Sequence, residues 1–292
     1  MNVSIIVFSP SGHTLKTAKM IEKVFTEKNN NVRLINITGK IDFLYGNRIK
    51  ENLEKDLGEY DVLFIGGPLY AGHVEHHILE IIEALPFPDE KHSNLAVPFV
   101  TYGGVHSSIA LEEMARHLKK KKYKSILGLK IAAKHTLTTT LSNIIYANKP
   151  GPEEEKLIEK AVERVISIIQ QGRSKAVDQY QVFKYAPTKE RIMFRQFSQE
   201  MIHKKFKKVT INTEKCIKCK KCISVCPVDM FQFIDGEISM HRDNNNCILC
   251  AECFHNCPVG AIEHPYIEMA GKRLKDGFAA LEKVPSAIYP TA

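Results

Sequence analysis

The stretch CIKCKKCISVCP, Cys216–Pro227, places four cysteines at steps of three, three and four residues and follows the last one with a proline. The same steps return in CILCAECFHNCP, Cys247–Pro258, which begins 31 residues later (247 − 216). These two runs contain all 8 cysteines of the chain. Thiols repeated at such short steps are typical of metal ligands, because one tight loop brings several sulfurs to the same centre. The repeat therefore predicts a compact metal-binding domain.

Structural zinc is the alternative for these cysteines. Zinc sites use two CxxC pairs that are well separated along the chain, with four ligands for each ion. Two matching CxxCxxCxxxCP runs fit iron–sulfur cubanes better, since three closely spaced thiolates cover three corners of a cubane and the fourth ligand comes from elsewhere. Between the runs, Asp235-Gly236 is flanked by apolar residues within 231–240, which predicts a β-hairpin.

The cysteine region resembles the bacterial two-[4Fe–4S] ferredoxins. In that family each run gives three ligands to one cluster and its fourth cysteine to the other. The resemblance implies two [4Fe–4S] clusters, one bound by Cys216, Cys219, Cys222 and Cys257 and the other by Cys247, Cys250, Cys253 and Cys226. Met230 and Phe231 follow the first run where alanine and isoleucine follow the second, a difference expected to affect packing and not ligation.

Length and composition are those of a globular chain. With 292 residues, of which 44% are hydrophobic and 25% charged, the chain has room for about two domains. Its start lacks the basic residues and long apolar run of a signal peptide, and no stretch reaches the ~18–20 apolar residues that span a bilayer. We therefore expect a cytoplasmic protein without a membrane span, a setting in which clustered cysteines bind metal more often than they form disulfides. The oligomeric state stays open.

The formal net charge is +8, and basic residues gather at 119–124 and 184–221. Nucleic-acid binding is one interpretation, but the chain has no recognised nucleic-acid motif, so we expect none. The alternatives are a solvated surface with cations at a helix C-terminus, a positive field around anionic cofactors, or a docking face for redox partner proteins that are acidic.

Ahead of the cysteines, apolar strands alternate with helical segments. Strands are expected at 3–9, 32–37, 61–68, 95–104 and 125–133, and helices at 12–28, 74–85, 109–121 and 152–171. The last helix is the clearest, with a proline at its start, acids in its first turn and a glycine after its end. This alternation predicts an α/β fold with a doubly wound parallel sheet, in which ligands bind beyond the carboxyl ends of the strands.

Three loops at those strand ends have suitable chemistry for a flavin. SPSGHT, residues 9–14, opens a helix whose N-terminus suits a phosphate, and it matches neither the nucleoside-triphosphate loop nor the Rossmann glycine motif. GGPLYAGHV, residues 66–74, and TYGGVHSS, residues 101–108, each place a tyrosine, Tyr70 or Tyr102, in a glycine-containing loop. An ordinary βα turn is the alternative for each loop taken alone.

Residues 1–172 resemble the flavodoxins, and the whole chain resembles the flavodoxin–ferredoxin fusion family of anaerobic bacteria and archaea. The resemblance implies a flavodoxin-like five-stranded sheet in the order 2-1-3-4-5 that binds FMN. It implies that the phosphate is bound by Ser9, Ser11, Gly12, His13 and Thr14, one side of the flavin by Pro68, Leu69, Tyr70, Ala71 and Gly72, and the other by Thr101, Tyr102, Gly103 and Gly104. The chain departs from the flavodoxin pattern in having Pro10 and Ser11 in the first loop and no tryptophan.

Four histidines crowd the same region. His73 and His106 are placed to hydrogen-bond a flavin or a substrate, whereas His76 and His77 are expected on a helix face. A structural histidine is the more frequent outcome for any one of them, and we assign no metal to them.

The sequence predicts four segments: a flavodoxin-like domain at 1–172, a basic and partly helical linker at 173–208, a small α+β ferredoxin domain at 209–265 and a C-terminal tail at 266–292. The expected function is electron transfer between FMN and the clusters for a partner redox enzyme, since a flavin exchanges one or two electrons and a cubane one. One alternative is a flavin-dependent reductase of a quinone, a porphyrin precursor or a nitro compound, fed by the clusters. Another is a scaffold without flavin. Whether the chain is an enzyme or an electron carrier stays open, as does any catalytic residue.

Overall fold

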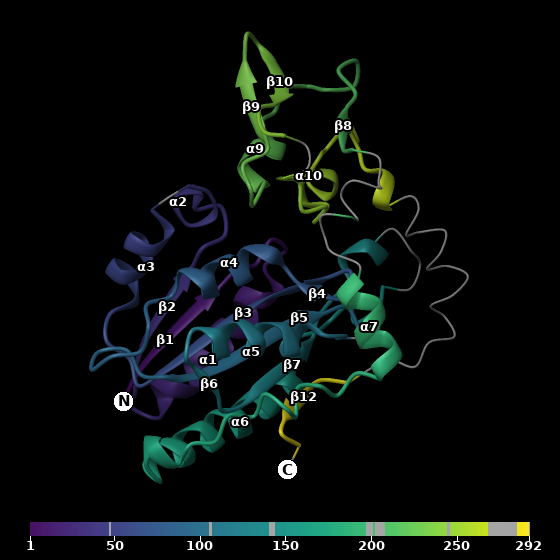
Figure 1. Cartoon of the computed structure of the whole chain (residues 1–292). Coiled ribbons are helices and arrows are strands. Elements are labelled where there is room, and N and C mark those ends of the chain that lie inside the picture. Colours follow the sequence, from purple (N-terminus) through teal and green to yellow (C-terminus); the bar gives the residue numbers. More distant parts are fainter. Residues whose placement is uncertain are drawn as a thin grey trace.

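The computed structural model describes residues 1–46, 48–104, 107–139, 144–196, 201, 208–243, 246–267 and 285–291. Five parallel strands form the main sheet in the order β2-β1-β3-β5-β7 (Figure 1). Their bounds are β1 Asn2–Val7, β2 Asn31–Asn36, β3 Val62–Tyr70, β5 Leu95–Tyr102 and β7 Gly128–Ala132. The predicted strand order 2-1-3-4-5 is thereby confirmed.

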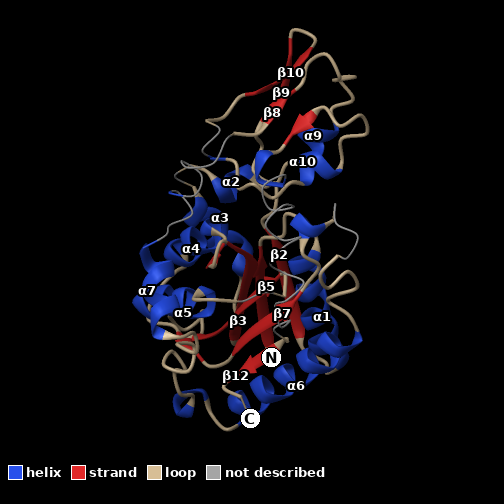
Figure 2. Ribbon diagram, turned by 90° about the vertical axis from the view of Figure 1, so that its right-hand side faces the viewer, coloured by secondary structure: helices blue, strands red, loops and turns tan. Residues whose placement is uncertain are grey.

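Helices cover both faces of this sheet (Figure 2). One face packs on α1 (His13–Glu27) and α6 (Pro152–Gln170), and the other on α3 (Ile49–Leu57), α4 (His76–Ala84) and α5 (Ala110–Lys120). Along β1, Ile5 packs in the core on the side of α1 and α6, and its neighbour Ile6 packs in the core on the side of α3, α4 and α5. Because both faces are buried, both kinds of position are apolar, which is why the strands read as continuous hydrophobic runs. The sequence did not indicate α3 or the short α2 (Ile41–Leu44) before it.

The third strand ends in a hairpin and not in the expected loop. It runs to Tyr70 and returns as β4 (His73–Val74), with Tyr70 opposite His73. Ala71 and Gly72 form the turn with φ of 52° and 89°, and two such left-handed residues suit the twist of a two-residue hairpin. This hairpin could not be predicted from the residue types, because alanine seldom adopts a left-handed conformation.

An antiparallel strand completes the far edge of the sheet. Strand β12 (Ala287–Tyr289) pairs with β7, while the two-residue β6 (Lys124–Ser125) pairs with β5. The Tyr289 ring stacks on that of Tyr185 at 4.5 Å between centroids, and the Lys130 ammonium lies 5.6 Å from each of these rings. Tyrosine faces attract a cation, so these contacts hold residues 285–291 against the first domain.

Part of the segment after α6 also packs on the first domain. It contains the short helical turn η2 (Arg173–Lys175) and α7 (Thr188–Gln196). The Arg191 guanidinium donates to both carboxylate oxygens of Glu112 on α5, at 2.7 and 2.8 Å. A Cβ added at Gly72 would overlap the ring of Phe194, so α7 lies tightly on the β3–β4 hairpin.

The cysteine region forms a small second unit beyond the carboxyl edge of the sheet (Figure 1). Its elements are β8 (Thr210–Ile211), α9 (Lys221–Val225), β9 (Phe231–Ile234), β10 (Glu237–Met240), α10 (Glu252–His255) and β11 (Ile262–Glu263). The predicted hairpin is confirmed: β9 pairs with β10 across Asp235 and Gly236, whose φ angles are 53° and 79°. The apolar core beneath α4 continues into this unit through Val228, Met230 and Ile248. Of the helices in the described ranges, none has the length and hydrophobicity to span a membrane.

Candidate electron-transfer site

The eight cysteines line two separate cavities. Cys216, Cys219, Cys222 and Cys257 line the first, which we call the outer site. Cys226, Cys247, Cys250 and Cys253 line the second, which we call the inner site. Each cavity thus takes three cysteines from one run and one from the other, the grouping that the ferredoxin resemblance implies. That these thiols bind clusters remains a prediction.

The two loops bend in the same way. Positive φ angles occur at Lys218 and Lys220 in the first loop, and at Leu249 and Ala251, which lie 31 positions further on. After the runs, the amide of Met230 donates to Cys226 Sγ at 3.3 Å and that of Ala261 to Cys257 Sγ at 3.1 Å, again 31 positions apart. Four sulfurs around a cavity, with backbone amides directed at sulfur, fit an iron–sulfur cluster.

The inner site is the more deeply buried. Cys219 of the outer site is exposed, whereas Cys250 and Cys253 are buried. Burial raises the pKa of the Cys247 thiol to about 11 and that of Cys250 well above its usual range. Ligand thiols lose their protons when they bind a metal, so cluster assembly would release these protons.

The inner site faces the carboxyl edge of the parallel sheet. The amide of Gly39, after β2, donates to the carbonyl of Pro227 at 3.0 Å, and the Tyr45 hydroxyl donates to the Val228 carbonyl at 3.3 Å. Burial raises the pKa of Tyr70, with further contributions from the charges of Cys250 and Glu75. The end of β3 therefore lies close to the inner site.

The first predicted loop has the properties of an anion site. Gly12, with φ of 79°, directly precedes α1, and no acidic residue occurs in the first turn of this helix. Ser9 Oγ accepts the amide of Leu15 at 2.8 Å. Burial lowers the pKa of His13, and the charges of Lys134 and Lys16 lower it further, which places two cations near this helix terminus. The amides, dipole and lysines fit a phosphate; the sequence analysis missed Lys134, which follows β7.

The first and third loops meet through their hydroxyls. Thr14 Oγ1 and Thr101 Oγ1 lie 2.7 Å apart in a buried hydrogen bond. Ser11 is half-buried, and Pro68 and Leu69 lie within β3. The loop after β1 and the end of β5 are therefore joined at the sheet edge where the resemblance places FMN.

The two tyrosines expected beside the flavin lie differently. Tyr70 is half-buried at the end of β3, near the inner site. The Tyr102 ring is buried instead, and its hydroxyl donates to the carbonyl of Pro285 at 2.7 Å, in the C-terminal segment that reaches β12. A role for Tyr102 beside a flavin therefore stays a prediction.

The rings of His135 and Tyr146, from the segment after β7, lie against the third predicted loop, at Gly103 and Gly104. A Cβ added at Gly103 would overlap the His135 ring, and one at Gly104 would overlap the Tyr146 ring. The sequence analysis missed both rings, although the fifth strand also ends at the carboxyl edge and its loop therefore belonged among the candidates.

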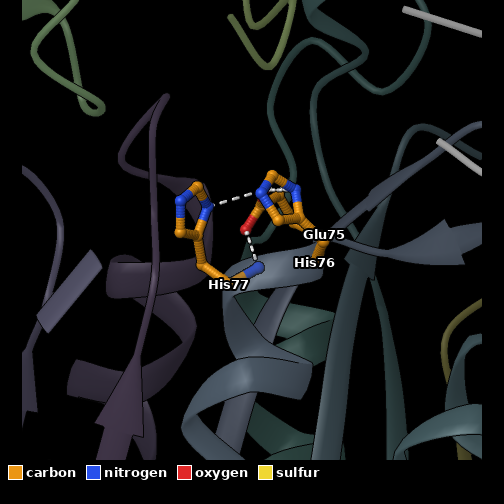
Figure 3. A group of neighbouring side chains, drawn as sticks. All are labelled: Glu75, His76 and His77. Carbon is orange, nitrogen blue, oxygen red and sulfur yellow. Dashed lines mark hydrogen bonds and ion pairs between the residues drawn. The ribbon is translucent and has the colours of Figure 1, made fainter. Parts of the chain in front are cut away.

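Glu75, His76 and His77 form a compact cluster at the start of α4 (Figure 3). Glu75 Oε1 lies 2.8 Å from His76 Nδ1 and 3.0 Å from His77 Nδ1, and Oε2 accepts the amide of His77 at 3.0 Å. Burial opposes ionisation of Glu75, but the hydrogen bonds from both histidines lower its pKa to about 2. The three groups satisfy one another, and the carboxylate also caps the helix.

The histidine predictions have mixed outcomes. His76 and His77 lie in the first turn of α4, as expected, and the His77 ring is buried against Phe8 and Tyr45. The His76 side chain is partly exposed. His73 Nδ1 lies 3.2 Å from Glu113 Oε1, and both side chains are largely buried. His106 lies outside the described residues.

Residues 199–264 match the family model of the 4Fe-4S dicluster domain. No curated protein matches the chain in sequence. Solved structures that are similar to it include flavodoxin 1 from Bacillus cereus, at 17% identity over 57% of this chain and 98% of that one, with a TM-score of 0.41. Rubredoxin oxygen:oxidoreductase from the anaerobe Desulfovibrio gigas is similar at 13% identity over 60% of this chain, with a TM-score of 0.42. This chain spans only 37% of the Desulfovibrio protein. At these scores the fold assignment rests on the strand order itself.

Proposed function

We propose that this chain, in which a flavodoxin-like α/β domain carries a 4Fe-4S dicluster domain, passes electrons between FMN and two [4Fe–4S] clusters for a partner redox protein. One arrangement carries the proposal: the inner site lies against the carboxyl edge of the sheet, close to Tyr70. This edge is where flavodoxin-like sheets bind FMN. A flavin exchanges one or two electrons and a cubane one, so the pair connects two-electron with one-electron partners.

We propose that the FMN phosphate binds the amides and hydroxyls at the start of α1, with Lys134 nearby. The flavin ring would then lie between Tyr70 on one side and the Gly103-Gly104 turn, with the rings of His135 and Tyr146, on the other. This order places the buried inner cluster next to the flavin and the outer cluster, with its exposed Cys219, farther along the path.

The surface around the outer site suggests the class of the partner. Lys215, Lys218, Lys220 and Lys221 are all exposed beside Cys219, whereas the matching positions of the second run are Asn246, Leu249, Ala251 and Glu252. The loop conformation therefore does not require the lysines. Ile217, which lines the outer cavity, is 60% exposed, so an apolar contact is available within the basic rim. We propose that an acidic redox protein docks here, steered by this charge.

The first experiment measures iron, sulfide and FMN per chain on protein purified without oxygen. We expect about eight iron, about eight sulfide and one FMN, the content of two cubanes and a flavin. Protein with its iron but unable to take up added FMN would refute flavin transfer and leave the scaffold alternative. Protein with about two metal ions and no sulfide would indicate zinc.

A second experiment tests the basic rim with small oxidants of opposite charge. Reduced protein is mixed in a stopped-flow instrument with ferricyanide, an anion, or with hexaammineruthenium(III), a cation. The variant Lys215→Glu/Lys221→Glu should react more slowly with ferricyanide and faster with hexaammineruthenium(III), and added salt should shrink both differences. The matched control is Lys156→Glu/Lys160→Glu on α6, where both lysines are exposed. Equal rates for both variants would refute a charged exit at the outer site while leaving the cofactor counts intact.

The reductase alternative receives less support. His73 was one of two histidines expected to hydrogen-bond a flavin or a substrate, but its ring is largely buried and lies 3.2 Å from Glu113. Turnover of a quinone or a nitro compound by the FMN-loaded protein would nevertheless establish it.

A further inference from the structure

His264 is a buried polar side chain that has no hydrogen-bond partner in the part of the chain that the structure describes. It directly follows β11 and is 1% exposed. Neither ring nitrogen has a partner among the described residues. A buried donor or acceptor that stays unpaired destabilises the folded protein, so this arrangement needs an explanation.

The position of the ring supplies one. His264 lines the inner cavity together with Cys226, Cys247, Cys250 and Cys253. Its ring meets that of Phe254 edge to face at 6.3 Å between centroids, which fixes one side of the imidazole. A sulfur-rich centre in this cavity would provide hydrogen-bond acceptors that none of the described residues offers to this ring.

The outer site lacks this feature. The residue 31 positions before His264 is Phe233, on the hairpin strand β9, and no histidine is among the described residues that line the outer cavity. The two sites are otherwise built alike, so the imidazole is an addition to the inner site and not a requirement of the fold.

We propose that His264 donates a ring N–H to a sulfur of the inner iron–sulfur cluster and thereby raises the reduction potential of that cluster relative to one without the donor. The physical reason is that an N–H directed at sulfur stabilises the extra negative charge of the reduced cluster. His264 is thus a positioning and tuning residue, not a ligand. This inference rests on the clusters of the proposed function, but not on FMN or on the docking partner.

The test is the variant His264→Phe, which introduces the residue found at the matching outer position, with His264→Gln as a variant that keeps an N–H donor. Both reduction waves are recorded by protein-film voltammetry, and iron is counted on the same samples. We expect one wave to move to lower potential in His264→Phe, the other to stay, and His264→Gln to recover part of the shift. Phe233→Leu is the control and should move neither wave.

Unchanged waves in His264→Phe with its full iron content would overturn the proposal, as would equal shifts in the Phe and Gln variants. Where His264→Phe fails to retain iron, the unmodified protein decides. Pulsed EPR of reduced protein labelled with ¹⁵N-histidine should show a histidine nitrogen coupled to one cluster, and the absence of any such coupling would overturn the proposal. An iron count of zero in unmodified protein would instead refute the cluster assignment itself.

Discussion

Cys219 and Cys250 hold matching places in two loops of the same conformation, yet the first is exposed and the second is buried. The difference lies in what surrounds each loop. The second run is close to the end of β3 and carries α10, whose His255 contacts the carbonyl of Thr136 at 3.1 Å. The first run is rimmed by exposed lysines. Cysteine spacing determines the loop, whereas its neighbours determine whether the site faces protein or solvent.

The largest expected effect comes from removing one cysteine from each site. Cys250→Ala and Cys219→Ala should each lower the iron content from about eight to about four per chain. Only Cys250→Ala should also separate the flavin from the remaining cluster, because the inner site lies between them. Stopped-flow absorbance follows flavin and cluster after mixing with a reductant. If Cys219→Ala separates them instead, the order of the two sites is reversed.

A smaller effect is expected at the group of Glu75, His76 and His77 at the start of α4. Glu75→Gln weakens the buried contacts with both histidines and should cost about 1–3 kcal/mol in the free energy of unfolding. The exposed Glu80→Gln on the same helix is the control and should cost less. Urea unfolding followed by circular dichroism measures both.

The pH dependence of that cost has a definite sign. The folded pKa of Glu75, about 2, lies below its ordinary value of 4.5, so its contribution is complete above about pH 4.5 and is lost as the pH falls towards 2. The stability difference between the unmodified protein and Glu75→Gln should therefore not narrow between about pH 8 and 5.5. A difference that narrows over this range would mean that the carboxylate is not held ionised.

A hydrogen bond beside the inner site can be compared with an ion pair beside the outer site, and the hydrogen bond is expected to contribute more. Tyr45→Phe removes the hydrogen bond to the Val228 carbonyl beside the inner site and should cost about 0.5–1.5 kcal/mol. The ring should keep its contact with the Arg242 guanidinium, 4.4 Å from its centroid. Unfolding should be measured together with iron retention.

The smallest effect is expected at the outer site. Glu237→Gln breaks the ion pair with Lys218, in which both side chains are largely exposed, and should change stability by about 0–1 kcal/mol, less in high salt. The same urea measurement applies. If this variant costs more than Tyr45→Phe, burial does not separate the two loops in the way argued above.

Sequence predicted those features that depend on local pattern. The apolar runs predicted parallel strands between helices, the cysteine steps predicted two loops, and Asp235-Gly236 predicted a hairpin, whereas the strand order came from the resemblance to the flavodoxins. Sequence did not predict contacts between side chains and segments that lie elsewhere along the chain. The Tyr102 hydroxyl donates to the carbonyl of Pro285, and the rings of His135 and Tyr146 lie against Gly103 and Gly104. The role inferred for His264 could not be predicted from the sequence, because it depends on the position of the ring in the inner cavity.

Strand β12 changes how the two domains are connected. Because Ala287–Tyr289 pair with β7, residues on both sides of the dicluster unit in the sequence belong to the first domain, which is therefore discontinuous along the chain. Docking of the edge strand also shields β7 from pairing with other chains. A version cut after residue 266 would therefore lose part of the first domain and leave an open sheet edge. The chain therefore passes between the two units twice, and grafting the cysteine unit onto another protein requires a connection at each of its ends.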